Sequence, residues 1–323
     1  MKKTILIISI LFLAASIIAG LCFGTEFISP LIIFEDLVSG VRTLKFEIIY
    51  EIRLPRIMAA AFAGAALSVS GAVFHSLFRN PLADPFITGV SGGASLGISF
   101  AVIFSLGPLL TIASSFTGSI IAIVILYIMS FGKGFGGGIF ILAGVAMSFI
   151  FSSSVMLLFS VAESQSVHKA LIWMMGDLSS GIVNQRIIFI LIFIIILLIW
   201  IYHRHINIIA LGRSFSHSSG ITDMELRIIL ILASVLAALT VILGGIIPFV
   251  GLMIPHIVRY FNGYDNETLI PLSAVTGETF LILADTVSRS LIFPYEIPIG
   301  IITGFAGGIF FLFFVFKSRE EVN

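Results

Sequence analysis

The chain has 323 residues, of which 59% are hydrophobic and only 11% are charged, and its mean hydropathy is +1.18. This composition lies far outside the balance of a soluble globular domain and predicts an integral membrane protein. The 17 basic and 17 acidic residues give a formal net charge of +0, so bulk charge supports neither nucleic-acid binding nor a disordered acidic tail.

The apolar segments predict an all-α, polytopic membrane protein. A transmembrane helix needs about 20 mostly apolar residues to cross about 30 Å of hydrocarbon. The alternating polarity of barrel strands is not visible. The rule predicts about ten spans, the eighth short enough to be a partly inserted helix. The expected spans are residues 5–23, 56–77, 89–106, 109–130, 138–160, 186–202, 226–246, 249–261, 268–290 and 297–316.

The first segment follows Lys2 and Lys3 and resembles a signal peptide at first sight. We interpret it as a retained first span, because no small-x-small cleavage site is followed by a soluble domain. Leu21 before Cys22 also fits a lipoprotein cleavage box poorly. Cys22 is the only cysteine, so one chain can form neither a disulfide nor a cysteine metal site.

Basic residues in the short loops favour cytoplasmic N- and C-termini, with a moderate bias towards the inside. This orientation places inside Lys2, Lys3, Arg79, Lys133, Arg204, Arg213, Arg227, Arg259, Lys317 and Arg319. It places outside Arg42, Lys45, Arg53, Arg56, Lys169, Arg186 and Arg289. The outer arginines therefore need an explanation of their own.

The longest polar inner loop covers about residues 203–226, and we call it the coupling segment below. Its turns at Gly212 and Gly220 predict one or two small surface helices. The segment is either a solvated connector or a docking surface for a cytoplasmic partner.

The motifs predict no catalytic residue, no metal site and no cofactor. Residues 131–138 read FGKGFGGG, which has glycines and a lysine in the wrong order for a phosphate-binding loop. His203 and His205 lack a third ligand at a defined spacing. No nucleophile elbow or zinc-protease motif occurs.

Ionisable residues within spans are the other place to look for function. Asp285 and Arg289 form an i,i+4 pair that we expect to be neutral near the outer end. Glu278, near the middle of the ninth span, has no such neighbour. It faces a cavity or pairs with His75 or His256 across helices; a structural hydrogen bond or a silent, protonated carboxyl is the alternative.

Three segments taken together resemble a known family. They read RLPRIMAAAFAGAALSVSGAVFHSLFRNPLADPFITGVSGGASLG (53–97), GIIPFVGLMIPHIVR (245–259) and ADTVSRSLIFPYEIPIGIITG (284–304). In this order they are similar to FecCD-type permease subunits of ABC importers for iron-siderophores, haem or vitamin B12. The resemblance runs from about residue 50 to the end of the chain.

The resemblance implies the type II, vitamin B12 permease-like importer fold, with residues 1–323 as a single transmembrane permease domain in the cytoplasmic (inner) membrane. It implies translocation of an iron-siderophore or a haem- or cobalamin-like chelate, with ATP hydrolysed by a separate subunit. The implied partners are ATP-binding cassette ATPase subunits, an extracytoplasmic substrate-binding protein, and a second permease copy or a paralogue in the lipid membrane, with no nucleic acid.

The resemblance also implies roles for individual residues. Binding-protein docking falls to Arg53, Arg56 and Arg289, whose planar guanidinium groups suit carboxylates. ATPase coupling falls to Ala210, Leu211, Gly212, Arg213, Gly220 and Ile221. Candidates for the translocation path and its gates are Asn80, Pro81, Gly89, Ser91, Gly92, Gly93, Pro255, His256, Glu278 and His75. The chain departs from the family pattern at His75, Arg213, Ser216, Ser219, Glu278 and Ile309.

Three other hypotheses compete with the importer permease. An ion-driven secondary transporter would place Glu278, Asp285 and His256 on the ion path. A membrane-embedded enzyme is disfavoured, because no catalytic constellation is clustered. A purely structural subunit would leave the R-L-P-R motif and the coupling segment without a purpose.

Overall fold

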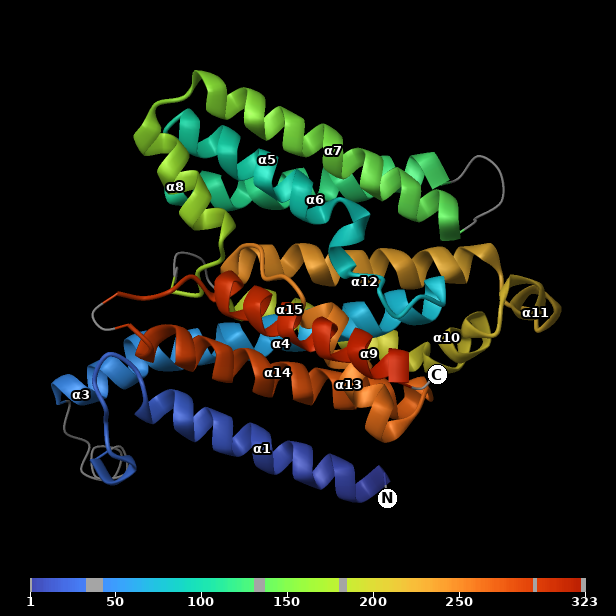
Figure 1. Cartoon of the computed structure of the whole chain (residues 1–323), viewed down its shortest axis with the longest axis horizontal. Coiled ribbons are helices and arrows are strands. Elements are labelled where there is room, and N and C mark those ends of the chain that lie inside the picture. Colours follow the sequence, from blue (N-terminus) through green and yellow to red (C-terminus); the bar gives the residue numbers. More distant parts are fainter. Residues whose placement is uncertain (1, 33–42, 131–136, 180–184, 293–294, 321–323) are drawn as a thin grey trace.

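The structure is a computed structural model that describes residues 2–32, 43–130, 137–179, 185–292 and 295–320 (Figure 1). Arg42 and Lys133, which contributed to the expected orientation, lie outside the described residues. Within the described ranges the regular structure is helical, apart from one isolated bridge between Ile292 and Tyr295.

The long helices are α1 (Lys2–Cys22), α4 (Leu54–Phe78), α5 (Val90–Ile103), α6 (Pro108–Ser130), α7 (Gly137–Val161), α9 (Gln185–Ile201), α12 (Asp223–Gly244), α13 (Val250–Asn262), α14 (Asn266–Ser290) and α15 (Ile299–Glu320). Shorter helical elements are α3 (Leu44–Glu47), the π-helical turn η1 (Ile48–Arg53), the 3₁₀ turn η2 (Pro85–Thr88), α8 (Ser164–Met174), α10 (His203–Ala210) and α11 (Arg213–Ser218).

The long helices correspond in order to the expected spans, which confirms an all-α polytopic protein with about ten spans. In the described part of the chain, six helices are long and apolar enough to cross a membrane by themselves. A seventh span forms if α9 and α10, bent by 58°, are taken together. The expected eighth span is α13, which is short at 13 residues and contains Pro255.

Helix α4 is the central helix of the fold, because small residues along it let its neighbours approach closely. A Cβ on Gly64 would collide with the carbonyl of Gly277 in α14, and one on Gly71 would collide with the carbonyl of Gly251 in α13. The backbones of α14 and α13 therefore touch that of α4, as is common where glycine lies between membrane helices.

The other helices lie around this centre. In Figure 1, α5, α6 and α7 lie on one side of α12, and α4, α13 and α14 lie on the other. Helix α1 runs along the outer side of α14. One end of the bundle holds the start of α1, the last turns of α15 and the whole of the short helices α10 and α11. Helices α3 and α8 lie at the opposite end.

The coupling segment folds as expected. Two short helices, α10 and α11, are separated by Gly212 with a φ of 123°, and Gly220 follows α11 with a φ of 83°. These left-handed values favour glycine, so both turns are set by the sequence. Helix α8 and the turn η1 had no counterpart among the expected elements.

Candidate functional site

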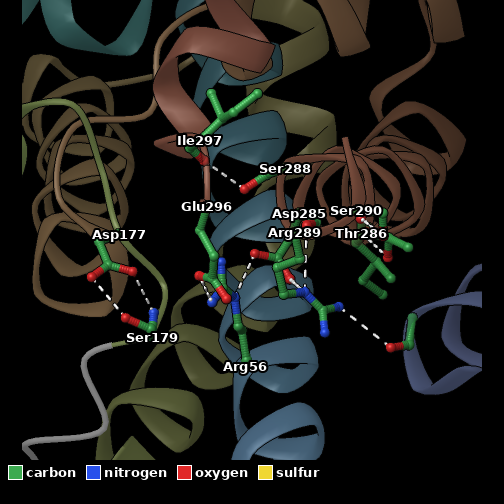
Figure 2. Close-up of polar contacts among 12 residues, drawn as sticks. Arg56, Asp177, Ser179, Asp285, Thr286, Ser288, Arg289, Ser290, Glu296 and Ile297 are labelled. Atoms are coloured by element: carbon green, nitrogen blue, oxygen red, sulfur yellow. Dashed lines mark hydrogen bonds and ion pairs between the residues drawn. The ribbon is translucent and has the colours of Figure 1, made fainter. Parts of the chain in front are cut away.

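The end of the bundle opposite α10 and α11 holds a buried ionic cluster (Figure 2). Arg56 of α4 donates from Nε to Oδ1 of Asp285 at 2.7 Å, and from Nη1 to Oε2 of Glu296 at 2.6 Å. Nε of Arg289 lies 3.0 Å from Oδ2 of Asp285, one helical turn away in α14. The expected Asp285–Arg289 pair is therefore formed, and we call these four residues the Arg56 cluster.

Arg53 and Arg289 hold the end of α1 in place. Arg53 donates from Nη1 to the carbonyls of Leu21 at 2.5 Å and Cys22 at 3.0 Å, and from Nη2 to the carbonyl of Glu26. Arg289 donates from Nη2 to the carbonyl of Gly20 at 3.3 Å. Helix termini leave their last carbonyls without partners, so these contacts satisfy the end of α1.

The three arginines expected to dock a partner are therefore buried and engaged within the chain. Arg53, Arg56 and Arg289 are 3%, 6% and 4% exposed, respectively. The side chain of Glu296, in contrast, is 43% exposed. Glu296 is thus the member of the cluster that a partner at this surface would meet first.

A pocket of ≈ 120 Å³ lies beside the Arg56 cluster and is lined by Arg56, Glu296 and the loop after α8. Asp177 in that loop accepts hydrogen bonds from the backbone N–H and the hydroxyl of Ser179, both at 2.7 Å. Carboxylates thus face the pocket together with one guanidinium group.

At the opposite end, a polar turn joins α4 to α5. Helix α4 ends at Arg79 with a φ of 51°, and Asn80 Oδ1 accepts from the Leu82 N–H at 3.0 Å. Asp84 Oδ1 accepts from the Phe86 N–H at 2.7 Å and caps η2. Burial raises the pKa of Asp84 to about 6, although the Phe86 N–H acts in the other direction. The turn includes the expected path residues Asn80 and Pro81.

The small residues that follow this turn pack helices together. A Cβ on Gly93 would collide with the carbonyl of Gly118 in α6, and one on Gly92 would lie 3.0 Å from Phe151 in α7. Gly89, with a φ of 76°, is the N-cap of α5 and lies beside Met147, and Ser91 is in the first turn of α5. Close helix packing accounts for these glycines, and a role in the path stays a prediction.

The coupling segment presents apolar side chains outwards. Leu211 is 65% exposed and Phe215 is 51% exposed, whereas Ile221 is 6% exposed and fixes the segment to the core. Gly212 is buried beside the Arg79 guanidinium, Gly220 is exposed, and Ala210 is half-buried. Helix α11 begins at Arg213, whose side chain lies outside the described part. Leu211 and Phe215 are four positions apart, and exposed apolar side chains that form a patch mark protein-binding sites.

The remaining path candidates lie apart from one another. His75 is buried, and neither ring nitrogen has a hydrogen-bond partner among the described residues. The ring of His256, next to the buried Pro255 in α13, packs edge-on against Phe314 with centroids 4.3 Å apart. Within the described part no hydrogen bond or ion pair joins the half-buried Glu278 to either histidine, so the expected partner of Glu278 is not found.

Comparison with known proteins identifies the family. Residues 11–317 match the FecCD transport family. The chain belongs to this family. It is 34% identical over 279 residues to the hemin transport system permease protein HmuU of Yersinia pestis, covering 84% of this chain and 83% of that protein. It is 32% identical over 323 residues to the vitamin B12 import system permease protein BtuC of Vibrio parahaemolyticus, covering 99% of this chain and 95% of that protein.

A solved structure described as a metal-chelate type ABC transporter in an inward-facing conformation shares the fold of this FecCD member. The TM-score is 0.85 at 28% identity, and the match covers 98% of this chain and 100% of the other. The chain is therefore a multi-pass transport permease of the ABC importer type. Glu296 is the member of the Arg56 cluster that the sequence analysis did not identify.

Proposed function

We propose that this chain is the permease subunit of an ATP-binding-cassette importer that carries a metal chelate such as hemin, cobalamin or an iron-siderophore. The names of the relatives support the chemical class of the cargo. Residues 1–323 act as one transmembrane permease domain, and a second permease copy completes the path. The path candidates Asn80, Pro81, Gly89, Ser91, Gly92, Gly93, Pro255, His256, Glu278 and His75 keep their proposed place near it.

The observation that carries this proposal is the apolar surface of the coupling segment. Leu211 and Phe215 are exposed on short helices that are anchored by buried Ile221. Such a surface, set beside the starts and ends of the spanning helices, suits docking of a cytoplasmic ATPase. The termini at the same end of the bundle are then cytoplasmic as well.

The Arg56 cluster is the proposed docking surface for the substrate-binding protein. An acidic side chain of that protein would replace Glu296 as the partner of Arg56, because Glu296 is the exposed carboxylate of the cluster. Arg53 and Arg289 support the site by holding α1 and Asp285.

Uptake into proteoliposomes tests this function. Vesicles containing the permease and its ATPase subunits receive hemin, cobalamin or a ferric siderophore, with and without internal ATP and the binding protein. We expect accumulation of one cargo that requires both ATP and the binding protein. Uptake that ignores ATP and follows an imposed proton gradient would contradict the proposal and favour an ion path through Glu278.

A further inference from the structure

A polar network at the α10–α11 end joins the coupling segment to the spanning helices. The side-chain amide of Asn207, in α10, lies against the N-terminus of α14. Its Oδ1 accepts from the backbone N–H of Asn266 at 2.9 Å and from Nδ2 of Asn266 at 2.7 Å. Its Nδ2 donates to Oδ1 of Asp265 at 3.0 Å. Asn207 therefore caps α14 from a different helix and contacts both residues at its start.

The network continues from α14 into two more helices. Asn266 is 1% exposed, and its Oδ1 lies 3.4 Å from the hydroxyl of Ser76 in α4, whose single proton is also directed at the Ala72 carbonyl at 2.9 Å. Arg259 in α13 donates from Nη2 to that hydroxyl and to the carbonyl of Ala72, both at 3.1 Å. Helices α10, α14, α4 and α13 are thus joined by one set of partly or fully buried polar contacts.

Helices α4 and α14 are in contact at three levels along their length. Ser76 and Asn266 join them at the α10–α11 end, and the backbones touch at Gly64 and Gly277. Arg56 and Asp285 join them at the other end. The 25 residues of α14 span about 37 Å at 1.5 Å per residue. Contacts between α4 and α14 therefore extend from the start of α14 to the Arg56 cluster.

Helix α11 of the coupling segment is attached to the start of α12, where Nε2 of His217 lies 3.4 Å from Oδ1 of Asp223. Helix α11 has six residues and lies between turns at Gly212 and Gly220, which can absorb movement. Helix α10 is anchored by the buried side chains of Ile206 and Ile209, and Nε2 of its His205 lies 3.3 Å from Oε1 of Glu225 in α12. Towards α14, the directional contacts of α10 that the structure describes are those of Asn207.

We propose that Asn207 is the positioning residue that transmits movement of the coupling segment to the paired helices α4 and α14. The inference rests on the proposed function, since it requires an ATPase that moves α10 and α11. Without Asn207, α10 moves while α14 stays behind, and ATP hydrolysis drives less transport.

The test compares Asn207→Leu with Asn262→Leu in the same proteoliposomes. Asn262 donates from Nδ2 to the hydroxyl of Thr268 at 2.7 Å, so it also binds the first turn of α14, but from α13 instead of α10. The readout is cargo accumulated per ATP hydrolysed, for whichever of hemin, cobalamin and ferric siderophore the wild type accumulates. Co-purification of the ATPase subunits checks assembly of each variant.

We expect Asn207→Leu to lower cargo per ATP by about two- to thirtyfold, the range seen for residues that link two sites, and Asn262→Leu to leave it near the wild-type value. Asn207→Asp serves if the leucine variant does not assemble; it keeps the volume and the acceptor but places a like charge beside Asp265, and it should also lower the ratio. An unchanged ratio in the Asn207 variants, or an equal fall in Asn262→Leu, would overturn the inference. A wild type without ATP-dependent uptake would instead defeat the proposed function, so the two failures are distinguishable.

Discussion

Asp285 pairs with two buried arginines, so its replacement should destabilise the fold strongly. The Arg56 cluster holds two guanidinium groups and two carboxylates, and Asp285 is within 2.7 and 3.0 Å of the two arginines. Asp285→Asn keeps the shape but leaves a net positive charge on the cluster, whose two arginine side chains are 6% and 5% exposed. Leaving a buried charge unpaired costs about 3–5 kcal/mol, which lowers the ratio of folded to unfolded protein by about two to four orders of magnitude.

Cys22 provides the assay, because it is the only cysteine, is buried, and accepts a hydrogen bond from Arg53 through its carbonyl. A thiol-reactive fluorescent dye in detergent solution reports the temperature at which Cys22 becomes accessible. We expect a clear decrease in that temperature for Asp285→Asn. The double variant Asp285→Leu, Arg289→Met should recover most of it, since Arg56 and Glu296 remain paired and the rest of the cluster becomes apolar. A single variant as stable as wild type, or a double variant no better than the single, would refute this reasoning.

Three further substitutions test other parts of the structure. Glu296→Gln removes the exposed carboxylate that competes for Arg56, so the binding protein should dock up to about fivefold more tightly in a surface-binding assay. The control Glu163→Gln, at the exposed N-cap of α8, should leave the docking affinity unchanged. Weaker docking of Glu296→Gln would mean that Glu296 itself binds the partner. Gly71→Ala forces a Cβ into the Gly251 carbonyl and should lower the free energy of unfolding by about 1–3 kcal/mol. The control Gly308→Ala has open space around the new Cβ in α15 and should not destabilise the protein. Equal unfolding temperatures of the two variants in the dye assay would contradict the close contact at Gly71. Burial raises the pKa of Asp84 to about 6, so the native state binds this proton more tightly than the unfolded state does. The free energy of unfolding should therefore fall as the pH rises from about 4 to 6, and Asp84→Asn should flatten this fall. Parallel curves of stability against pH for the two proteins would exclude a contribution from Asp84.

The sequence predicted the features that depend on local spacing. The i,i+4 geometry of a helix was enough for the Asp285–Arg289 pair, and the glycines were enough for the turns at Gly212 and Gly220. The contact of Arg56 with Asp285 crosses 229 positions, and that of Asn207 with Asn266 crosses 59. Such pairs depend on how helices pack, which no spacing within one helix records. The same limit explains why, among the residues that the structure describes, neither of the two histidines considered as one alternative for Glu278 contacts it.

The burial of the outer arginines also constrains how docking acts on the permease. An acidic side chain that replaces Glu296 at Arg56 must move the segment that carries Glu296, and the residues just after Glu296 hold this segment to two helices. The Ile297 N–H donates to the carbonyl of Ser288 in α14 at 3.2 Å, and the Ser288 hydroxyl donates to the Ile297 carbonyl at 2.6 Å. The Ile299 N–H donates to the carbonyl of Gly176, in the loop after α8, at 3.3 Å. When another carboxylate replaces Glu296 as the partner of Arg56, the start of α15 and the loop after α8 should therefore move together. Substitution of Glu296 should then change both the docking of the binding protein and the opening of the permease at this end of the bundle.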